Sequence, residues 1–356
     1  MTIVYVLVAV LLFGILIILH EMGHFTAAKI CGVKVNEFSL GMGPLLWQKK
    51  KGETAYSLRL FPIGGYCAME GEEEDSDDPR AFSAQSPWRR FWILISGAAM
   101  NFLTGLLIVA VLYGSAAAFY SPIIVDFAPQ CPLERTDALQ KGDRIVSIDG
   151  ERIYVYSDIG LLLQWSPSPT HDITLHRQGE KVYLKDLPME VREYPAADGQ
   201  GTYRGYGLSF GVEEATFGKK IAYTWNQTID FARMVRLSLR MLLTGEAGIK
   251  DMSGPVGIVS TMTQMGEQSK TTRDALENIA YLGAMIAVNL AIMNMLPLPA
   301  LDGGRIFFLL VNAVFYGLFR RQIPAKYENY VHFAGMILLL TFMVIVTCSD
   351  IFKLFQ

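Results

Sequence analysis

The chain has 356 residues, of which 51 % are hydrophobic and 18 % are charged, and its formal net charge is −3 at pH 7. This balance suits a protein that is partly dissolved in lipid better than a soluble globule, and the absence of a basic tract argues against nucleic acid as a partner. The four cysteines show no CxxC spacing, which argues against a thiolate metal site or a disulfide framework. The lipid bilayer is the partner that the composition implies.

Four segments without a charged residue approach the length of about 20 residues that crosses a bilayer. They are residues 3–19, 91–125, 278–301 and 331–349. We therefore predict a membrane α-helical fold with four transmembrane helices, at about 3–28, 91–115, 278–319 and 331–349, in a first half at 1–120 and a second half at 276–356. The third helix is predicted to be broken at its Leu-Asp-Gly motif. The first helix lacks the basic start and the cleavage site of a signal peptide, so we expect it to be retained.

Lysine and arginine residues cluster after the first predicted helix, at 29–90, and again at 305–326. Short cytoplasmic loops are enriched in these residues. Both loops are therefore predicted to be cytoplasmic, which places the two termini and the segment between the second and third helices outside. In a bacterium, this orientation corresponds to a multi-pass protein of the cytoplasmic (inner) membrane.

Between the first two predicted helices, residues 35–69 alternate apolar and polar side chains with interspersed glycine and proline. This pattern predicts a β-hairpin. The acidic run at 70–78 that follows it predicts a solvated loop.

Residues 121–192 lose the membrane signature and predict one small soluble α+β domain. Within it, residues 139–150 indicate a strand closed by an Asp-Gly turn, and the stretch resembles a PDZ domain. Because PDZ domains bind an extended chain by strand addition, this domain suggests recognition of a polypeptide. His171 and His176 in this domain, and His332 near the last helix, are predicted to be surface or interfacial residues.

Residues 193–275 are predicted to contain an amphipathic helix and a linker. Apolar residues recur at helical spacing over 217–243, opposite a charged face. Such a helix can lie on the outer membrane surface, or it can equally pack against the PDZ-like domain.

The first motif that carries chemistry is His20-Glu21-Met22-Gly23-His24. Two histidines four residues apart on a helix project from one face and can bind a single zinc ion, with Glu21 beside it. The motif ends an apolar helix, and ionisable residues near a bilayer are costly enough to need a compensating role. The alternative interpretation is that the cluster merely marks the end of the helix.

The second motif lies in the third predicted span, where two prolines and two glycines surround Asp302. Irregular backbone at membrane depth is tolerated only where protein or a water-filled cavity surrounds it. Asp302 is therefore a candidate third ligand, because two histidines and one carboxylate leave the open position of a catalytic zinc site. Standing alone, Asp302 could instead be a capping or turn residue.

The HExxH pattern at 20–24, the NxxPxPxLDG pattern at 294–303 and the PDZ-like segment together resemble the site-2 protease family. Within that family the chain is similar to the regulator of sigma-E protease (RseP) type. The likeness extends to residues 61–66, 80–88, 97–102 and 253–258. The chain has room for one PDZ-like domain where the sigma-E type has two, so the particular substrate of that type is not carried over.

The resemblance implies roles for the motif residues. It makes His20, His24 and Asp302 ligands of Zn²⁺, Glu21 the catalytic acid and base, and Asn289, Asn294, Pro297 and Pro299 substrate-binding residues. It also implies that the hairpin is a membrane-associated β element beside the active site. The two asparagines could alternatively form hydrogen bonds between helices.

The predicted activity is that of an intramembrane-cleaving zinc metalloprotease that acts within or near the transmembrane segment of single-span proteins. The resemblance implies anti-sigma factors or signal-peptide remnants as substrates, with the PDZ-like domain as a docking site or a size filter. An alternative is a transporter or metal channel, since broken helices with buried ligands also serve ion binding. A further alternative is a catalytically silent membrane scaffold.

Overall fold

The computed structural model describes residues 2–72, 76–166, 168–196, 201–248, 252–321 and 324–354. They form two compact units. The first unit comprises Met1–Leu112 with Phe231–Gln356, and the second comprises Tyr113–Asp230. The predicted soluble domain at 121–192 falls inside the second unit.

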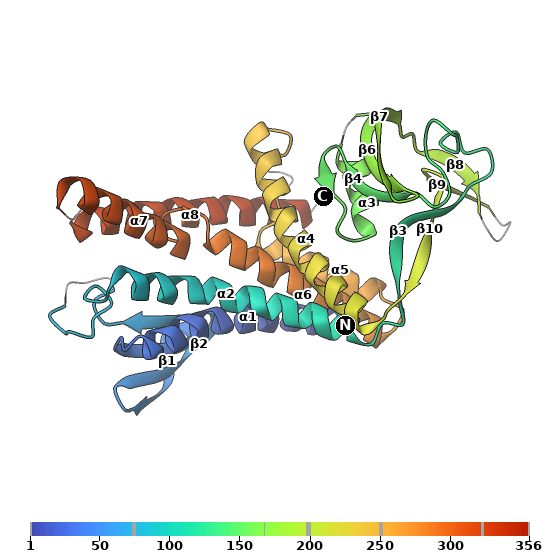
Figure 1. Cartoon of the computed structure of the whole chain (residues 1–356). Helices are drawn as coiled ribbons and strands as arrows, with labels where there is room; N and C mark the ends of the chain where they lie inside the picture. The colour runs from blue at the N-terminus through green and yellow to red at the C-terminus, as the bar shows by residue number, and fades with distance from the viewer. Residues whose placement is uncertain are drawn as a thin grey trace. The chain divides into compact units, whose positions relative to one another are not determined.

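The first unit is mainly helical (Figure 1). Its helices are α1 (Thr2–Ile30), α2 (Pro87–Gly114), α5 (Pro255–Gln268), α6 (Thr272–Asn294), α7 (Asp302–Phe319) and α8 (Ala325–Leu354). Helix α4 (Phe217–Thr244) begins in the second unit and ends in the first, over the stretch predicted to be an amphipathic helix.

Five described helices are long and apolar enough to cross a membrane. They are Val4–Ile30, Pro87–Gly114, Thr272–Asn294, Asp302–Phe319 and Lys326–Lys353. The count exceeds the predicted four because the third span, predicted at 278–319 with a break at the Leu-Asp-Gly motif, consists of two helices that are each long and apolar enough to be counted. The result is a multi-pass membrane protein.

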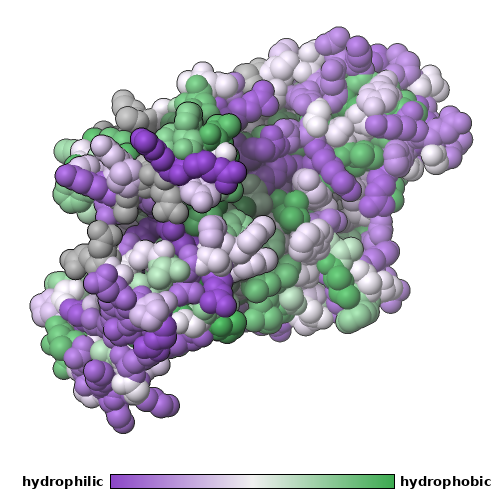
Figure 2. Space-filling view, turned by 60° about the vertical axis from the view of Figure 1, so that its left-hand side comes forward, coloured by the Kyte–Doolittle hydropathy of each residue, from purple (hydrophilic) through white to green (hydrophobic). Residues whose placement is uncertain are grey.

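Many large apolar side chains on these helices are exposed. On α8, for example, Leu338 is 70 % exposed and Val344 is 58 % exposed. Figure 2 shows such hydrophobic residues (green) at the surface of the protein. Exposure of this extent is costly in water and favourable in lipid, which agrees with helices that lie in a bilayer.

The segment that separates α6 from α7 carries Pro297 and Pro299. Proline has no backbone N–H and clashes with the preceding turn, so α6 ends before these residues. The segment folds back closely on the first turn of α7: a Cβ atom at Gly303 would lie 2.3 Å from the carbonyl oxygen of Leu296, and one at Gly304 would lie 2.2 Å from that of Leu298. Only glycine fits at these two positions.

Helices α1, α5 and α6 pack through one apolar cluster. It contains Ala9, Leu16, Met262, Ile279, Leu282, Ile286 and Ala287. A buried carboxylate holds the start of α5: Asp350 of α8 accepts hydrogen bonds of 2.8 Å from the backbone N–H groups of Gly254 and Gly257. These contacts fix the interior of the helical unit.

The predicted hairpin is formed by β1 (Val35–Lys51) and β2 (Thr54–Met69), and both long strands bend. Residues 35–40 pair with 65–69 on one side, residues 37–40 pair with 55–58 on the other, and 47–51 pair with 54–58. Gly41 has a φ of 84°, in the left-handed region that glycine adopts freely, where β1 turns. Each strand is thus divided into two half-strands. The half-strand of residues 65–69, called the outer strand below, lies at one edge of this small sheet.

The second unit is built on a six-stranded sheet with the order β10-β3-β4-β6-β7, and with β5 paired to β4. Its elements are β3 (Ala118–Phe127), β4 (Arg144–Ile148), β5 (Glu151–Arg152), α3 (Ser157–Trp165), β6 (Thr170–Arg177), β7 (Glu180–Pro188), β8 (Arg192–Pro195), β9 (Thr202–Gly205) and β10 (Leu208–Glu214). Strands β8 and β9 pair separately.

The prediction that His171 lies at the surface is wrong. His171 is only 2 % exposed, and its Nδ1 atom lies 2.7 Å from a carboxylate oxygen of Asp149. The same Asp149 accepts a hydrogen bond from the backbone N–H of Asp172. The ring is therefore buried in the second unit as part of a local hydrogen-bonded turn. His176 is exposed, as predicted.

Candidate metal centre

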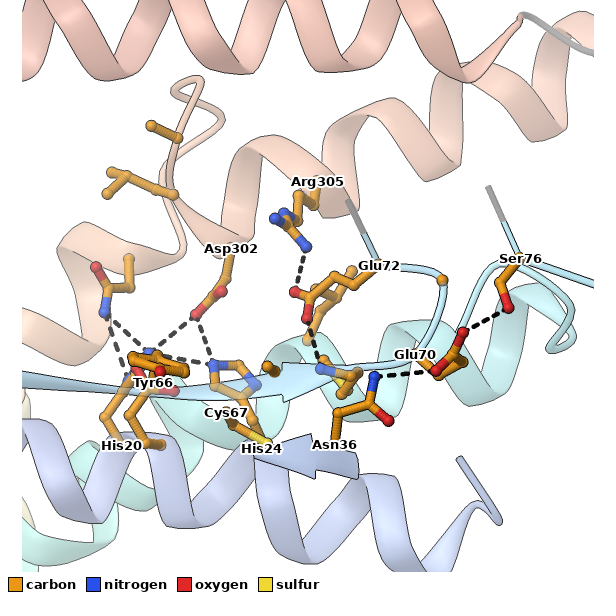
Figure 3. A pocket seen from close by; sticks show the side chains of 18 residues that line it. His20, His24, Asn36, Tyr66, Cys67, Glu70, Glu72, Ser76, Asp302 and Arg305 are labelled. Atoms are coloured by element: carbon orange, nitrogen blue, oxygen red, sulfur yellow. Dashed lines mark hydrogen bonds and ion pairs between the residues drawn. The ribbon is translucent and has the colours of Figure 1, made fainter. Parts of the chain in front are cut away.

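The two histidines of the first motif lie on one face of α1 and are buried, at 8 % exposure for His20 and 6 % for His24. Asp302 is the first residue of α7 and faces them across a cavity (Figure 3). The Nε2 atoms of the two rings are 3.2 Å apart. One carboxylate oxygen of Asp302 lies 3.2 Å from Nε2 of His20 and 3.3 Å from Nε2 of His24. Three potential metal ligands therefore converge.

These distances fit a zinc ion. A tetrahedral zinc with bonds of about 2.0–2.1 Å holds its ligand atoms roughly 3.3–3.4 Å apart. The three observed separations are 3.2, 3.2 and 3.3 Å. The converging oxygen of Asp302 is buried, and apart from the close approach of the two imidazole nitrogens it has no hydrogen-bond partner among the described residues. A buried carboxylate oxygen in that state is satisfied by a cation, so the residues present fit a metal.

A hydrogen bond at Nδ1 fixes the tautomer of the His24 imidazole. Nδ1 of His24 donates a hydrogen bond of 2.8 Å to the backbone carbonyl of Ile93 on α2. With the proton on Nδ1, the lone pair on Nε2 is free to bind a metal. Helix α2, which carries none of the predicted ligands, therefore holds the His24 ring in the tautomer that can bind a metal through Nε2.

Asp302 is held by the irregular segment before it. Ala300, with a φ of 71°, donates a backbone hydrogen bond of 2.9 Å to Nδ1 of His332 on α8. The tight approach of residues 296–298 to Gly303 and Gly304 fixes the first turn of α7 from the other side. The helix break and the two glycines thus determine the position of the carboxylate.

The cavity around these residues has a volume of about 610 Å³. Glu21 lines it together with the three candidate ligands, and so do Asn294 and residues 66–69 of the outer strand. The outer strand belongs to the two-stranded β1–β2 sheet, in which no described strand other than β1 pairs with it. An unpaired strand edge therefore borders the candidate metal centre.

The other end of the cavity is polar, and its lining includes Glu70 and Arg305. Hydrogen bonds from Ser76, Asn36 and Lys34 lower the pKa of Glu70 to about 2. Burial raises the pKa of the Cys67 thiol, which also lines the cavity.

Of the four predicted substrate-binding residues, Asn294 lines the cavity with the candidate ligands, and Asn289, Pro297 and Pro299 do not. Asn294 is in the cavity, with its Nδ2 atom 3.5 Å from both ring nitrogens of His20. Asn289 and Pro297 are exposed and do not line the cavity. Pro299 packs against α8, where a Cβ atom at Gly335 would lie 2.2 Å from it.

Two residues on α2 that were given no predicted role touch the histidines. The Nδ2 atom of Asn101 on α2 lies 3.4 Å from Nδ1 of His20, and Gly97 packs directly on both rings. An amide within an otherwise uncharged span was the available signal, since a polar group at membrane depth needs a partner. Which partner it has could not be known without the packing of α1 on α2.

Comparison with known proteins agrees with the geometry. The sequence matches peptidase family M50 over residues 8–342. A Clostridium perfringens protein named "Putative zinc metalloprotease" is 35 % identical over 349 residues, which cover 98 % of each chain. The regulator of sigma-W protease RasP of Bacillus subtilis is 24 % identical over 432 residues, which cover 98 % of this chain and 99 % of that one. The chain therefore belongs to peptidase family M50, the site-2 proteases, and is a membrane zinc metalloprotease.

Proposed function

We propose that this protein hydrolyses peptide bonds within or near the transmembrane segment of single-span membrane proteins. The observation that supports this proposal is the convergence of His20, His24 and Asp302 in a cavity that also contains Glu21 and a free strand edge. The ligand-bearing helices α1 and α7 are both candidate membrane spans, so the reaction is expected at or inside the bilayer.

In this proposal, Nε2 of His20, Nε2 of His24 and one oxygen of Asp302 hold Zn²⁺. When bound, zinc supplies a Lewis acid that polarises the peptide carbonyl and makes water nucleophilic near neutral pH. Three protein ligands leave the fourth position open, as catalytic zinc sites require. The carboxylate of Asp302 also offsets part of the positive charge in a site of low polarity.

Glu21 is proposed as the general base and acid. Its side chain lines the same cavity as the ligands, directly after His20 in the chain. It takes a proton from the attacking water and returns it to the leaving amine. No other described carboxylate lines the cavity within one residue of a candidate ligand, which favours Glu21 over Glu70 and Glu72 for this step.

The substrate must present an extended backbone to this site. A helix hides its carbonyl groups in internal hydrogen bonds, so the cleaved segment has to unwind and then needs new partners in the apolar surroundings. The edge of residues 65–69 can supply them by strand addition, beside the metal centre. Asn294 can hydrogen-bond the substrate next to His20, while Asn289, Pro297 and Pro299 would contact it farther from the metal.

The proposed substrates are anti-sigma factors and signal-peptide remnants, already shortened by another protease. The name of the Bacillus subtilis relative, a regulator of a sigma factor, supports the first class. The domain within 121–192 would act as a docking site or a size filter on the outer side, where both termini are also proposed to lie. Deleting residues 121–192 should then change which substrate lengths are cleaved, and unchanged length selection would remove that role.

The test is reconstitution of the full chain in detergent with a single-span substrate. Glu21→Gln should retain one zinc per chain and cleave about 10²–10⁴-fold more slowly, because it keeps the ligands and loses the base. Glu277→Gln, an exposed change on α6, is the matched control and should leave both properties unchanged. Full activity of Glu21→Gln, or cleavage that persists after removal of zinc by a chelator, would contradict the proposal.

A further inference from the structure

Helix α2 contacts the candidate metal ligands through three residues spaced four apart: Ile93, Gly97 and Asn101. Residues at this spacing lie along one face of a helix. All three are buried, at 0 % exposure for Ile93 and 1 % for Asn101. This face of α2 therefore lies against the two imidazoles of the metal centre.

Gly97 allows the backbone of α2 to approach the rings. A Cβ atom at this position would lie 2.3 Å from Nε2 of His24 and 2.7 Å from Cε1 of His20. Both distances are far below van der Waals contact. Because Gly97 has no side chain, Ile93 and Asn101, which lie one turn before and one turn after it, reach the Nδ1 atoms of His24 and His20.

Each of the two imidazoles needs a hydrogen-bond acceptor for its Nδ1 atom. When Nε2 of a histidine binds a metal, Nδ1 carries the proton and requires an acceptor. His24 has one in the carbonyl oxygen of Ile93, at 2.8 Å. For His20, the side chain at the corresponding place on α2 is Asn101, whose amide nitrogen lies 3.4 Å from Nδ1.

The amide of Asn101 is free to turn. Its Oδ1 atom is buried and has no hydrogen-bond partner among the described residues. A half-turn of the amide therefore breaks no existing bond of that oxygen, and it places the oxygen next to Nδ1 of His20. An amide nitrogen in that place could not pair with a protonated Nδ1, since both groups would be donors.

We propose that Asn101 is a positioning residue for the zinc site, whose amide oxygen accepts the Nδ1 proton of His20. The inference rests on the proposed role of His20 as a zinc ligand. The Ile93 carbonyl and the Asn101 amide then perform the same task for the two histidines, from one face of one helix. Loss of such an outer partner typically weakens metal affinity about 10- to 100-fold.

The experiment measures zinc affinity of the full chain in detergent, without substrate, by competition with a chromophoric chelator. Asn101→Leu keeps the size and removes the acceptor, so its zinc dissociation constant should rise about 10- to 100-fold. Asn101→Asp keeps an acceptor oxygen and should bind zinc nearly as tightly as the wild type. Thr104→Val is the matched control, because Thr104 lies on α2 and donates its hydrogen bond to Met100 of the same helix.

Affinity of Asn101→Leu equal to that of the wild type would overturn the inference. An equal loss in Asn101→Leu and Asn101→Asp would also overturn it, because packing and not the acceptor would then be responsible. If Asn101→Leu does not fold, the smaller Asn101→Ala, which also lacks an acceptor, replaces it with the same expectation. Failure of the proposed function has a different signature: the wild type itself would bind no zinc.

Discussion

Arg305, three residues after Asp302 on α7, forms an ion pair with Glu72 in the segment that follows β2. The two side chains are only 27 % and 18 % exposed. Both line the cavity of the metal centre and a neighbouring cavity of about 570 Å³. The pair connects the end of the outer strand to the helix that carries Asp302. The ion pair thereby fixes the position of the outer strand relative to Asp302.

Reversing either charge of this pair should lower stability and activity together. We expect Arg305→Glu or Glu72→Arg to cost about 1–3 kcal/mol, because each places two like charges in a partly buried site. The double swap should recover part of that loss, with a coupling of about 1 kcal/mol. Thermal inactivation in detergent and cleavage rates measure both effects. The exposed pair Arg273–Glu277 is the matched control, and its reversal should change neither quantity measurably.

Asp302→Asn should remove most of the zinc. The amide is a weaker ligand and supplies no negative charge. We therefore expect the affinity for zinc to fall by more than about 100-fold, which exceeds the loss expected when a hydrogen-bond partner of a ligand, such as Asn101, is removed. Cleavage should fall below detection. Metal analysis of the purified protein checks this outcome, with Asp274→Asn at the start of α6 as the control. A zinc-loaded Asp302→Asn variant with normal affinity would exclude Asp302 as a ligand.

Gly97→Ala should disrupt the metal centre without introducing any new polar group. The added methyl would overlap Nε2 of His24, so either the ring or α2 must move. We expect loss of zinc and of cleavage. At Gly114, the last residue of α2, an added Cβ meets nothing within 4 Å, so Gly114→Ala should preserve both. Normal zinc content in Gly97→Ala would show that α2 does not pack on the rings.

Glu70 should make the stability of the fold depend on pH. Its folded pKa of about 2 lies below its ordinary value of 4.5, so it stabilises the fold fully above about pH 5. That contribution declines as the pH falls from about 4.5 towards 2. The difference in melting temperature between the wild type and Glu70→Gln should therefore be constant from pH 8 to about 5.5 and shrink below 4.5. A difference that does not change with pH would contradict the ion-pair network around Glu70.

The sequence was sufficient for features that depend on local pattern. Uncharged stretches identified the lipid-exposed helices, because lipid imposes one composition along the whole length of a span. The spacing of His20 and His24 predicted that both rings lie on one face of a helix, because two residues four apart share a face. The alternation at 35–69 identified the hairpin, since strands have a period of two.

The tertiary structure decided what depends on distant contacts. The break in the third span was predicted, but the close packing of 296–298 on Gly303 and Gly304 sets where α7 begins after it. The partnership of Asn101 with His20 and the ion pair of Glu72 with Arg305 join segments far apart in the chain. No periodicity encodes such pairs, because they arise only when separate helices pack and bury polar groups that must then find one another.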